Sequence, residues 1–255
     1  CTQKDFYWTK TCPANKVNSI WLTEALKEAL IEAANKGWEK PGRIRFWRSS
    51  MKSIIKKSLE NLEIDALVSR RTYSLFERIR FLEEEVYPKE KGYVNGILAP
   101  NFTSTISNEP TPLPEAVRGD SLTISAITIG ELKKAQNWPI EFGDIFPIED
   151  SINNDYLIPG LRLFSENRAM ALAAWFSSLE PVKLLIDNDR LILEALEDDK
   201  WLVTDLPKNE ANELLKKFEE ARKTSYGYQF ISIQSNPFVE KFSGFWILQD
   251  IELQI

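Results

Sequence analysis

The chain has 255 residues, of which 43% are hydrophobic and 27% charged, so it can bury a substantial core in one large domain or two small ones. It contains no histidine, which excludes Ser-His-Asp and Cys-His nucleophile systems and the usual zinc ligands. Cys1 and Cys12 are its only cysteines, which excludes a disulfide framework and a four-cysteine zinc site and favours a reducing compartment.

Helices and strands alternate in the first part of the chain. Apolar residues at helical spacing predict a helix over 19–36, which ends before Gly37. A strand at 43–48, a helix at 49–62, a strand at 64–68 and a helix at 70–87 follow in that order. Strands that alternate with helices of this length indicate an α/β fold with parallel strand pairing.

The later elements begin after a proline-rich loop at 92–118. The predicted order is a strand at 121–129, a short helix at 130–136, an irregular linker at 138–160, a strand at 161–164, a helix at 166–179, strands at 182–186, 190–196 and 200–206, a helix at 208–223, and strands at 228–234 and 244–251. The Asp187-Asn188-Asp189 run between two apolar runs is typical of a β-hairpin turn.

These elements predict an α/β protein built from two similar-sized α/β halves. The expected domains are 1–137, with mainly parallel strand–helix units, and 138–255, with a mixed sheet and the β-hairpin. The sequence leaves open whether the halves form one sheet or two.

The net charge of −6 hides an asymmetry along the chain. Residues 1–100 contain 18 Lys and Arg against 13 Asp and Glu, whereas residues 101–255 contain 14 against 25. Within 43–80 the count is ten basic to four acidic residues. A local basic patch, rather than the charge of the whole chain, governs the approach of an anion. The alternative is that these charges form an ordinary solvated surface.

Three predicted strands end at a serine that opens the next helix, namely Ser49, Ser69 and Ser165. Serine caps a helix by accepting a hydrogen bond from an otherwise unpaired backbone N–H. If the strands are parallel, all three serines lie at one sheet edge. Open α/β sheets bind ligands at that edge, and helix N-termini attract anions there.

Basic residues stand at the first two of these turns. Arg70 and Arg71 fall in the first turn of the predicted helix, where each cation costs roughly 0.3–1 kcal/mol unless an anion is present. Arg48 precedes the other cap, and Lys52 follows it. Because arginine binds phosphate bidentately, this arrangement favours a phosphate-binding edge.

The same pattern also has an internal explanation. Asp65 precedes the arginines and Glu77 follows them, so either carboxylate could neutralise a guanidinium. Tyr73 could stack on a base, as could Trp47, but its spacing from Phe76 is more typical of a core helix face. Whether a protein carboxylate or an external anion compensates the arginines stays open at this point.

A carboxylate-metal nuclease is a weaker alternative. Asp187, Asp189 and Glu194 could hold a metal, but Asp-Asn-Asp is what a hairpin turn prefers in any case. A nuclease core would place Glu-x-Lys here, whereas Ala195 and Leu196 follow Glu194. With ten glycines in the chain, no phosphate loop or dinucleotide fingerprint is present. We therefore expect neither a catalytic metal nor a cofactor.

Several segments, spread over nearly the whole chain, match one family in order. They are "DFYW" at 5–8, "VSRRTYSLFERI" at 68–79, "VYPKEKGY" at 86–93, "PTPLPEAVRGDSL" at 110–122, "IEFGDIFPI" at 140–148, "IPGLRLFSENRAMALAAWFSSLE" at 158–180 and "FSGFWILQDI" at 242–251. The chain thereby resembles the Tab/Atab-type RNA-binding proteins of cyanobacteria and chloroplasts. It departs from the family near its start, where "WTKTCPANK" stands in place of the usual Arg-Pro.

The resemblance implies a non-catalytic factor that binds the A/U-rich leader of a photosystem I message. It would promote translation or assembly of photosystem I, with photosystem II as a further target. The implied partners are single-stranded A/U-rich RNA and translation or photosystem-assembly proteins, in the cyanobacterial cytoplasm or the plastid stroma. Together with the charge argument, the resemblance leads us to assign RNA contact to Arg45, Arg48, Lys52, Arg70, Arg71, Tyr73 and Arg118.

A protein-interaction factor is the principal alternative function. In that case the acidic C-terminal half would dock a translation or assembly partner, and RNA contact would be incidental. No apolar run approaches the ~20 residues of a membrane span, so none is expected. The first residues show no secretory signal pattern, and the missing initiator Met indicates a fragment or a processed chain.

Overall fold

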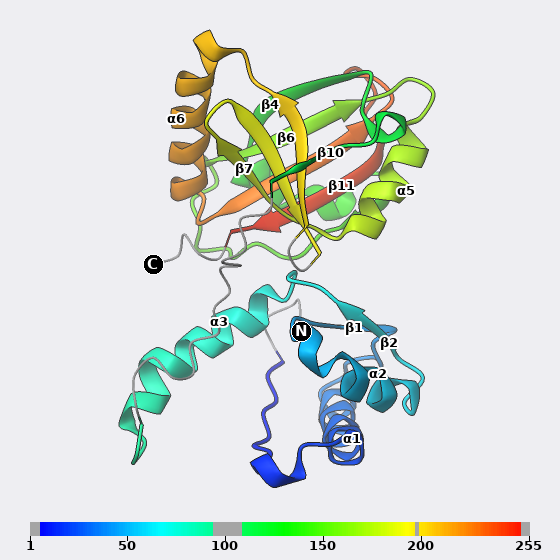
Figure 1. Cartoon of the computed structure of the whole chain (residues 1–255), viewed down its shortest axis with the longest axis vertical. Coiled ribbons are helices and arrows are strands. Elements are labelled where there is room, and N and C mark those ends of the chain that lie inside the picture. The colour runs from blue at the N-terminus through cyan, green and yellow to red at the C-terminus, as the bar shows by residue number, and fades with distance from the viewer. Residues whose placement is uncertain (1–5, 94–108, 197–198, 251–255) are drawn as a thin grey trace. The chain divides into compact units, whose positions relative to one another are not determined.

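A computed structural model of the chain describes residues 6–93, 109–196 and 199–250. The chain divides between Ser74 and Leu75 into a first unit and a second unit (Figure 1). The sequence predicted the division between 137 and 138, and two halves of similar size. The structure differs because strand Ser121–Thr128 pairs with strand Leu157–Phe164 and so joins the sheet of the second unit.

The first unit contains a parallel pair of strands and two helices. Its elements are α1 (Ser19–Asn35), β1 (Arg43–Phe46), α2 (Lys52–Glu60) and β2 (Asp65–Val68). The Asn18 side chain caps α1 by accepting the N–H of Trp21, and Gly37 ends that region with a φ of 81°. The parallel pairing of β1 with β2, expected from the strand–helix–strand order, is confirmed.

The helix that follows β2 differs from its prediction at both ends. It was expected over 70–87, but α3 spans Tyr73–Phe81. A π-helical turn at Leu82–Val86 and a 3-10 turn at Tyr87–Lys89 continue it. Arg70 and Arg71 therefore precede the helix instead of occupying its first turn.

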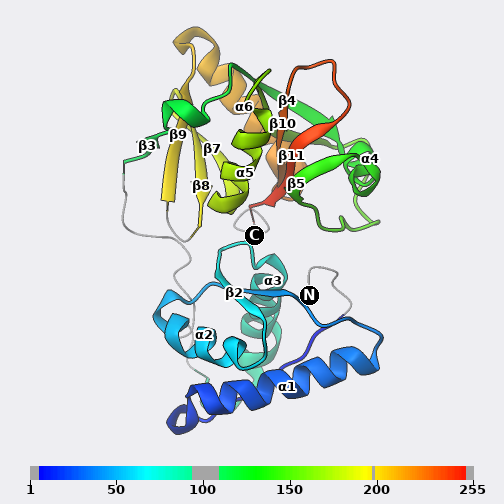
Figure 2. The ribbon, with the colours of Figure 1, turned by 90° about the vertical axis from the view of Figure 1, so that its right-hand side faces the viewer.

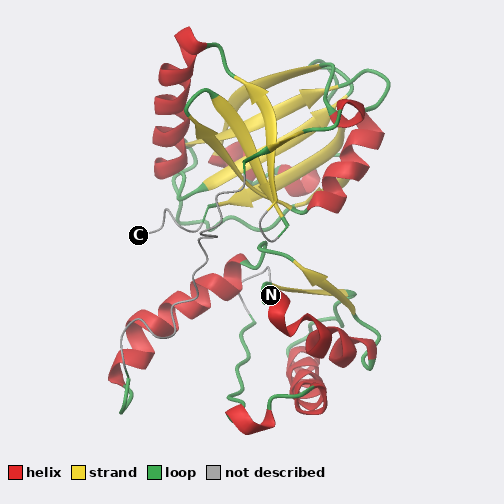
Figure 3. Cartoon of the chain, viewed as in Figure 1, coloured by secondary structure: helices red, strands yellow, loops and turns green. Residues whose placement is uncertain are grey.

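The second unit consists of two sheets with helices around them (Figure 3). Its elements are β3 (Thr111–Pro112), β4 (Ser121–Thr128), α4 (Ile129–Leu132), β5 (Ile140–Asp144), β6 (Leu157–Phe164), α5 (Ala169–Leu179), β7 (Pro181–Asp187), β8 (Arg190–Ala195), β9 (Asp199–Asp205), α6 (Lys208–Thr224), β10 (Tyr228–Gln234) and β11 (Phe242–Gln249). The five-stranded sheet has the order β4-β6-β10-β11-β5, and the four-stranded sheet has the order β3-β9-β8-β7. None of the helices in the described ranges is long and apolar enough to cross a membrane.

The hairpin prediction is confirmed, and one strand was missed. Strands β7 and β8 pair antiparallel through Asp187 and Arg190, with Asn188 in the left-handed conformation at φ 57°. The region 138–160, expected to be an irregular linker, contains β5, which pairs parallel with the distant β11. Most of the predicted loop at 92–118 lies outside the described residues.

Helix α5 lies between the two sheets (Figure 2) and anchors the main core. Its Leu172 and Phe176 are fully buried against side chains of both sheets, such as Leu193 of β8 and Ile231 of β10. Most residues of this core have branched aliphatic or aromatic side chains. Each such side chain that is fully buried contributes about 1.5–3 kcal/mol to the stability of the fold. This packing joins the two sheets of the second unit through one core.

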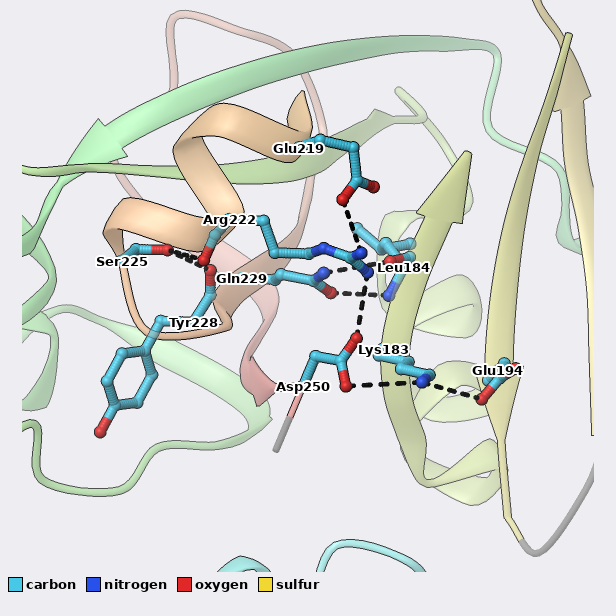
Figure 4. A network of polar contacts seen from close by, with 9 residues as sticks. All are labelled: Lys183, Leu184, Glu194, Glu219, Arg222, Ser225, Tyr228, Gln229 and Asp250. Atoms are coloured by element: carbon cyan, nitrogen blue, oxygen red, sulfur yellow. Dashed lines mark hydrogen bonds and ion pairs between the residues drawn. The ribbon is translucent and has the colours of Figure 1, made fainter. Parts of the chain in front are cut away.

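Buried charges also join the two sheets (Figure 4). The Nζ of Lys183 on β7 lies 3.4 Å from Oδ1 of Asp250 and 3.9 Å from Oε2 of Glu194 on β8. The other Asp250 oxygen accepts a hydrogen bond from Nη1 of Arg222 on α6 at 3.0 Å. Asp250, just after β11, thus holds a lysine from one sheet and an arginine from α6.

A glutamine side chain completes the connection between the sheets. Gln229 of β10 is fully buried; its Oε1 accepts the N–H of Leu184 at 2.7 Å, and its Nε2 donates to the Leu184 carbonyl at 3.0 Å. The amide therefore satisfies both main-chain groups of a β7 residue (Figure 4).

Candidate nucleic-acid interface

The candidate interface is the carboxyl end of the β1–β2 pair in the first unit. Phe46 and Val68 pair at the last step of the ladder, and the N–H of Ser69 donates to the Phe46 carbonyl at 2.9 Å. Because the strands are parallel, the residues that follow each of them leave from the same edge. Arg48 and Arg70 therefore start from one end of the strand pair, as the sequence predicted.

Ser69 shapes the turn after β2, although it does not cap a helix. It is fully buried, and its Oγ accepts the N–H of Arg71, two residues on, at 3.0 Å. This local hydrogen bond satisfies a main-chain donor outside the helix and places Arg70–Thr72 in a turn. The expected conflict between the two arginines and the dipole of a first helical turn is accordingly relieved.

Arg71 and Tyr73 are buried, with 4% and 6% of their surface exposed. The guanidinium carbon of Arg71 lies 5.8 Å from the centre of the Tyr73 ring. This geometry packs the two side chains against each other, and little of the Tyr73 ring is exposed.

Of the two carboxylates predicted as partners of Arg70 and Arg71, Asp65 lies away from the turn. Asp65 pairs across the strands with Arg43 at 3.9 Å, at the opposite end of β2, about 10 Å from the turn. Arg45, Arg70, Arg71 and Glu77 each make further interactions within the chain.

Exposed cations continue from this edge along α2. Arg48 is exposed and its guanidinium carbon lies 4.9 Å from the centre of the Trp47 ring. Lys52, Lys56 and Lys57 are exposed on α2, which has no acidic residue in its first turn. Among the residues that the structure describes, these three lysines take part in no ion pair. We call Arg48, Lys52, Lys56 and Lys57 the basic strip.

Two predicted features belong to the second unit instead. Arg118 is exposed there, and its Nε donates to the Leu113 carbonyl at 2.8 Å. Ser165 follows β6, whose sheet is separate from the β1–β2 pair. The three serines therefore do not share one sheet edge, because only the first two strands pair with each other.

Residues 1–81 match the model of the RNA-binding protein Tab2/Atab2 N terminal, and residues 100–249 match that of the RNA-binding protein Tab2/Atab2, C-terminal domain. The chain belongs to the Tab2/Atab2 family of RNA-binding proteins. The N-terminal match ends where α3 ends, and the C-terminal match contains the boundary predicted at 137/138.

Two relatives are named Protein TAB2 homolog, chloroplastic. The protein from Zea mays is 30% identical over 253 residues, covering 96% of this chain and 63% of the relative. The protein from Arabidopsis thaliana is 30% identical over 255 aligned residues, covering 95% of this chain and 66% of the relative. This chain thus spans about two thirds of the length of either relative. No solved structure matches it significantly.

Two segments that carry the Tab2/Atab2 resemblance meet at a site that the sequence did not reveal. Asp120 accepts hydrogen bonds from Nη2 of Arg168 at 2.8 Å, from the Ser165 hydroxyl at 2.9 Å and from the N–H of Glu166 at 3.0 Å. These donors, the Arg168 guanidinium first, lower the pKa of Asp120 below its ordinary value. Gly119 is needed beside them because a Cβ there would press on main-chain oxygens of Ser121 and Phe164.

The carboxylates considered for a nuclease do not converge in this Tab2/Atab2 chain. Asp187 lies at the hairpin turn and pairs with Arg190 at 3.4 Å. Glu194 lies near the other end of β8, between Lys183 and Lys200 at 3.9 and 3.8 Å. Within the described ranges, no three Cys, Asp or Glu side chains are grouped so that they could hold a metal ion.

Proposed function

We propose that this protein is a non-catalytic RNA-binding factor that recognises the A/U-rich leader of a photosystem message. It would promote translation and biogenesis of photosystem I, in the plastid stroma or the cyanobacterial cytoplasm. The observation that carries the proposal is the match of both parts of the chain to the two domains of an RNA-binding family. The chloroplastic relatives support the plastid setting.

The distribution of charge between the two units supports RNA contact by the first unit. Residues 1–74 contain 14 Lys and Arg against 8 Asp and Glu, a net charge of +6, and residues 75–255 contain 18 against 30, a net charge of −12. The structural division therefore separates the charges more sharply than the predicted one. Phosphates would be attracted by the first unit and repelled by most of the second.

Within the first unit, the basic strip supplies the phosphate contacts of the proposal. Lys52 and Lys56 stand one turn apart on α2, where two like charges repel each other unless an anion lies between them. Arg48 lies over the Trp47 ring, and the indole could also stack on an unpaired base. Arg45 and Arg70 are half-buried and flank the strip, while Arg71 and Tyr73 support the turn.

The first experiment measures RNA recognition itself. Filter binding compares the A/U-rich leader of a photosystem I message with a G/C-rich RNA of equal length. We expect tighter binding of the leader and an affinity that falls as salt rises, because each neutralised phosphate releases counterions. Equal affinity for both RNAs would overturn the proposed leader recognition, and binding that salt does not weaken would overturn the phosphate contacts.

The double variant Arg48→Ala/Lys52→Ala tests the assigned surface. Both side chains are exposed, so the variant should fold, unlike variants of the buried Arg71. We expect about 10-fold weaker leader binding or more, and a salt slope reduced by about 1.4, since two phosphate contacts to a single strand are lost. Lys216→Ala/Lys217→Ala on α6 removes equal charge from the second unit and should leave both values unchanged. The reverse order of effects would place the RNA on the second unit.

A further inference from the structure

Strand β4 forms one margin of the five-stranded sheet. It pairs antiparallel with β6 along its whole length, from Ser121 opposite Phe164 to Thr128 opposite Leu157. Among the strands that the structure describes, none pairs with its other edge. An edge strand of eight residues presents a row of main-chain donors and acceptors, which proteins commonly cover or bind.

A groove of about 510 Å³ runs beside this edge, between β4, β6 and α6. Helix α6 flanks the sheet near these strands (Figure 1) and contributes Leu214, Phe218 and Ala221, which share one helix face at i, i+4 and i+7. The β6 residues Leu157 and Pro159 line the opposite wall.

The contribution of β4 shows that the groove reaches the main chain. Successive side chains of a strand point to opposite faces, so one face alone would expose alternate residues. Here Ile124, Ser125 and Ala126 line the groove consecutively. The groove therefore contacts main-chain atoms of the edge strand β4 as well as side chains of one of its faces.

The lining is apolar and accessible. Leu157 is 50% exposed and the neighbouring Tyr156 is 37% exposed, both large fractions for such side chains. Lys217 is the one basic residue among the groove-lining residues of the described chain, and it is paired with Glu213 at 2.6 Å. An apolar groove with its single cation already paired, in a unit of net charge −12, does not suit RNA.

We propose that this groove binds an extended peptide segment of a partner protein. The segment adds as a sixth strand to the free edge of β4 and places apolar side chains at alternate positions against Leu214, Phe218 and Leu157. Main-chain hydrogen bonds to an edge strand supply affinity in this mode, and the pockets for alternate side chains supply selectivity.

The size of the groove favours a peptide over a folded partner or a second copy of the chain. Thirteen residues line it, fewer than the about 20–30 residues per side of a stable protein–protein interface. Its volume is sufficient for a few side chains from one extended segment, within the ~300–1,000 Å³ range of ligand sites. The free strand edge adds the polar contacts that an apolar groove lacks.

The test begins with a phage-displayed library of random 12-residue peptides, selected on the immobilised full chain. The enriched peptides are synthesised, and their affinity is measured for the wild type, Ala126→Arg and Thr123→Arg. Ala126 is exposed in the groove, whereas Thr123 is exposed on the same strand but outside it, so the two variants are matched in strand and charge.

We expect the enriched peptides to have apolar residues at alternate positions. They should bind Ala126→Arg at least about tenfold more weakly than the wild type, and Thr123→Arg with the affinity of the wild type. N-methylation of alternate peptide amides should weaken binding by a similar factor, because it removes the donors that face β4. In the unmodified protein, the bound peptide should slow hydrogen exchange of the amides at 121–128, a readout that holds even if a variant fails to fold.

Three results would overturn the proposal. The first is that no enriched peptide binds the two variants with different affinities. The second is full binding of the N-methylated peptides or unchanged exchange at β4, which would exclude strand addition. The third is a concentration-dependent dimer that Ala126→Arg abolishes, which would show that a second copy of the chain covers the groove.

Discussion

At the scale of single residues, the two units use charged side chains differently. In the first unit, Lys52 and Lys56 are exposed on one helix, where an external anion can reach them. In the second unit, Lys183 and Arg222 are buried beside carboxylates and hold the fold together. Burial therefore distinguishes the proposed RNA surface from a structural network, although both are rich in cations.

Asp250→Ala tests that network. Removal of the carboxylate leaves Lys183 and Arg222 each with one fewer counter-charge in a buried site, which costs about 3–5 kcal/mol of unfolding free energy. Urea unfolding followed by circular dichroism measures the loss. Glu213→Ala, which breaks an exposed pair with Lys217, is the control and should change stability little. Equal effects of the two variants would contradict a structural role for Asp250.

Asp120 gives a prediction that depends on pH. Its folded-state pKa lies below the unfolded value because Arg168 and Ser165 donate to the carboxylate. The stabilisation is therefore complete above the unfolded pKa of about 3.9, and it is lost as pH falls through the folded pKa. Asp120→Asn should lower the melting temperature at pH 6, and the difference from wild type should shrink towards pH 3. A difference that stays constant or grows on acidification would contradict this origin.

At the scale of elements, structure that depends on adjacent residues could be predicted from the sequence, whereas pairing between distant strands could not. The turn at Asn188 and the apolar runs beside it identify the hairpin from adjacent residues alone. Strand β5 is short, contains Gly143 and follows Pro139, so its sequence gives little sign of a strand. It exists because β11, about a hundred residues later, pairs with it. The same long-range pairing moves β4 into the second unit.

The candidate site was predictable to a similar extent. The position of Arg48 and Arg70 at one end of a parallel pair follows from strand order, and the structure has it so. The burial of Arg71 and Tyr73 could not be read from the sequence, because it depends on how the Ser69 turn folds back. Asp120 and Arg168 are 48 positions apart in the sequence, and no local sequence pattern predicts their contact.

Gly143→Ala tests the close approach of β5 to β11. A Cβ at this position would overlap the carbonyl oxygen of Phe245, and a main-chain atom cannot move aside cheaply. We expect a loss of about 1–3 kcal/mol in unfolding free energy, measured by urea unfolding. Gly42→Ala is the matched control, since a Cβ there meets nothing within 4 Å and the residue has no positive φ. A neutral Gly143→Ala would show that β5 is not held against β11 as described.

At the scale of the whole molecule, the division between the units coincides with a division of charge. The first unit carries a net charge of +6 and exposes the basic strip, whereas the second carries −12 and presents the apolar groove at β4. Attraction of phosphate and docking of a peptide would then occur on separate units of one chain. On both proposals, RNA and a protein partner would use different surfaces.

In the proposed function, the first unit holds the RNA through the basic strip. Ultraviolet cross-linking of the full chain to the A/U-rich leader, followed by mass spectrometry of the cross-linked peptides, tests it most directly. We predict cross-links concentrated within 45–57, at Trp47 above all, and their loss as salt rises or in Arg48→Ala/Lys52→Ala. Cross-links concentrated in the second unit and unaffected by the double variant would contradict RNA binding by the basic strip.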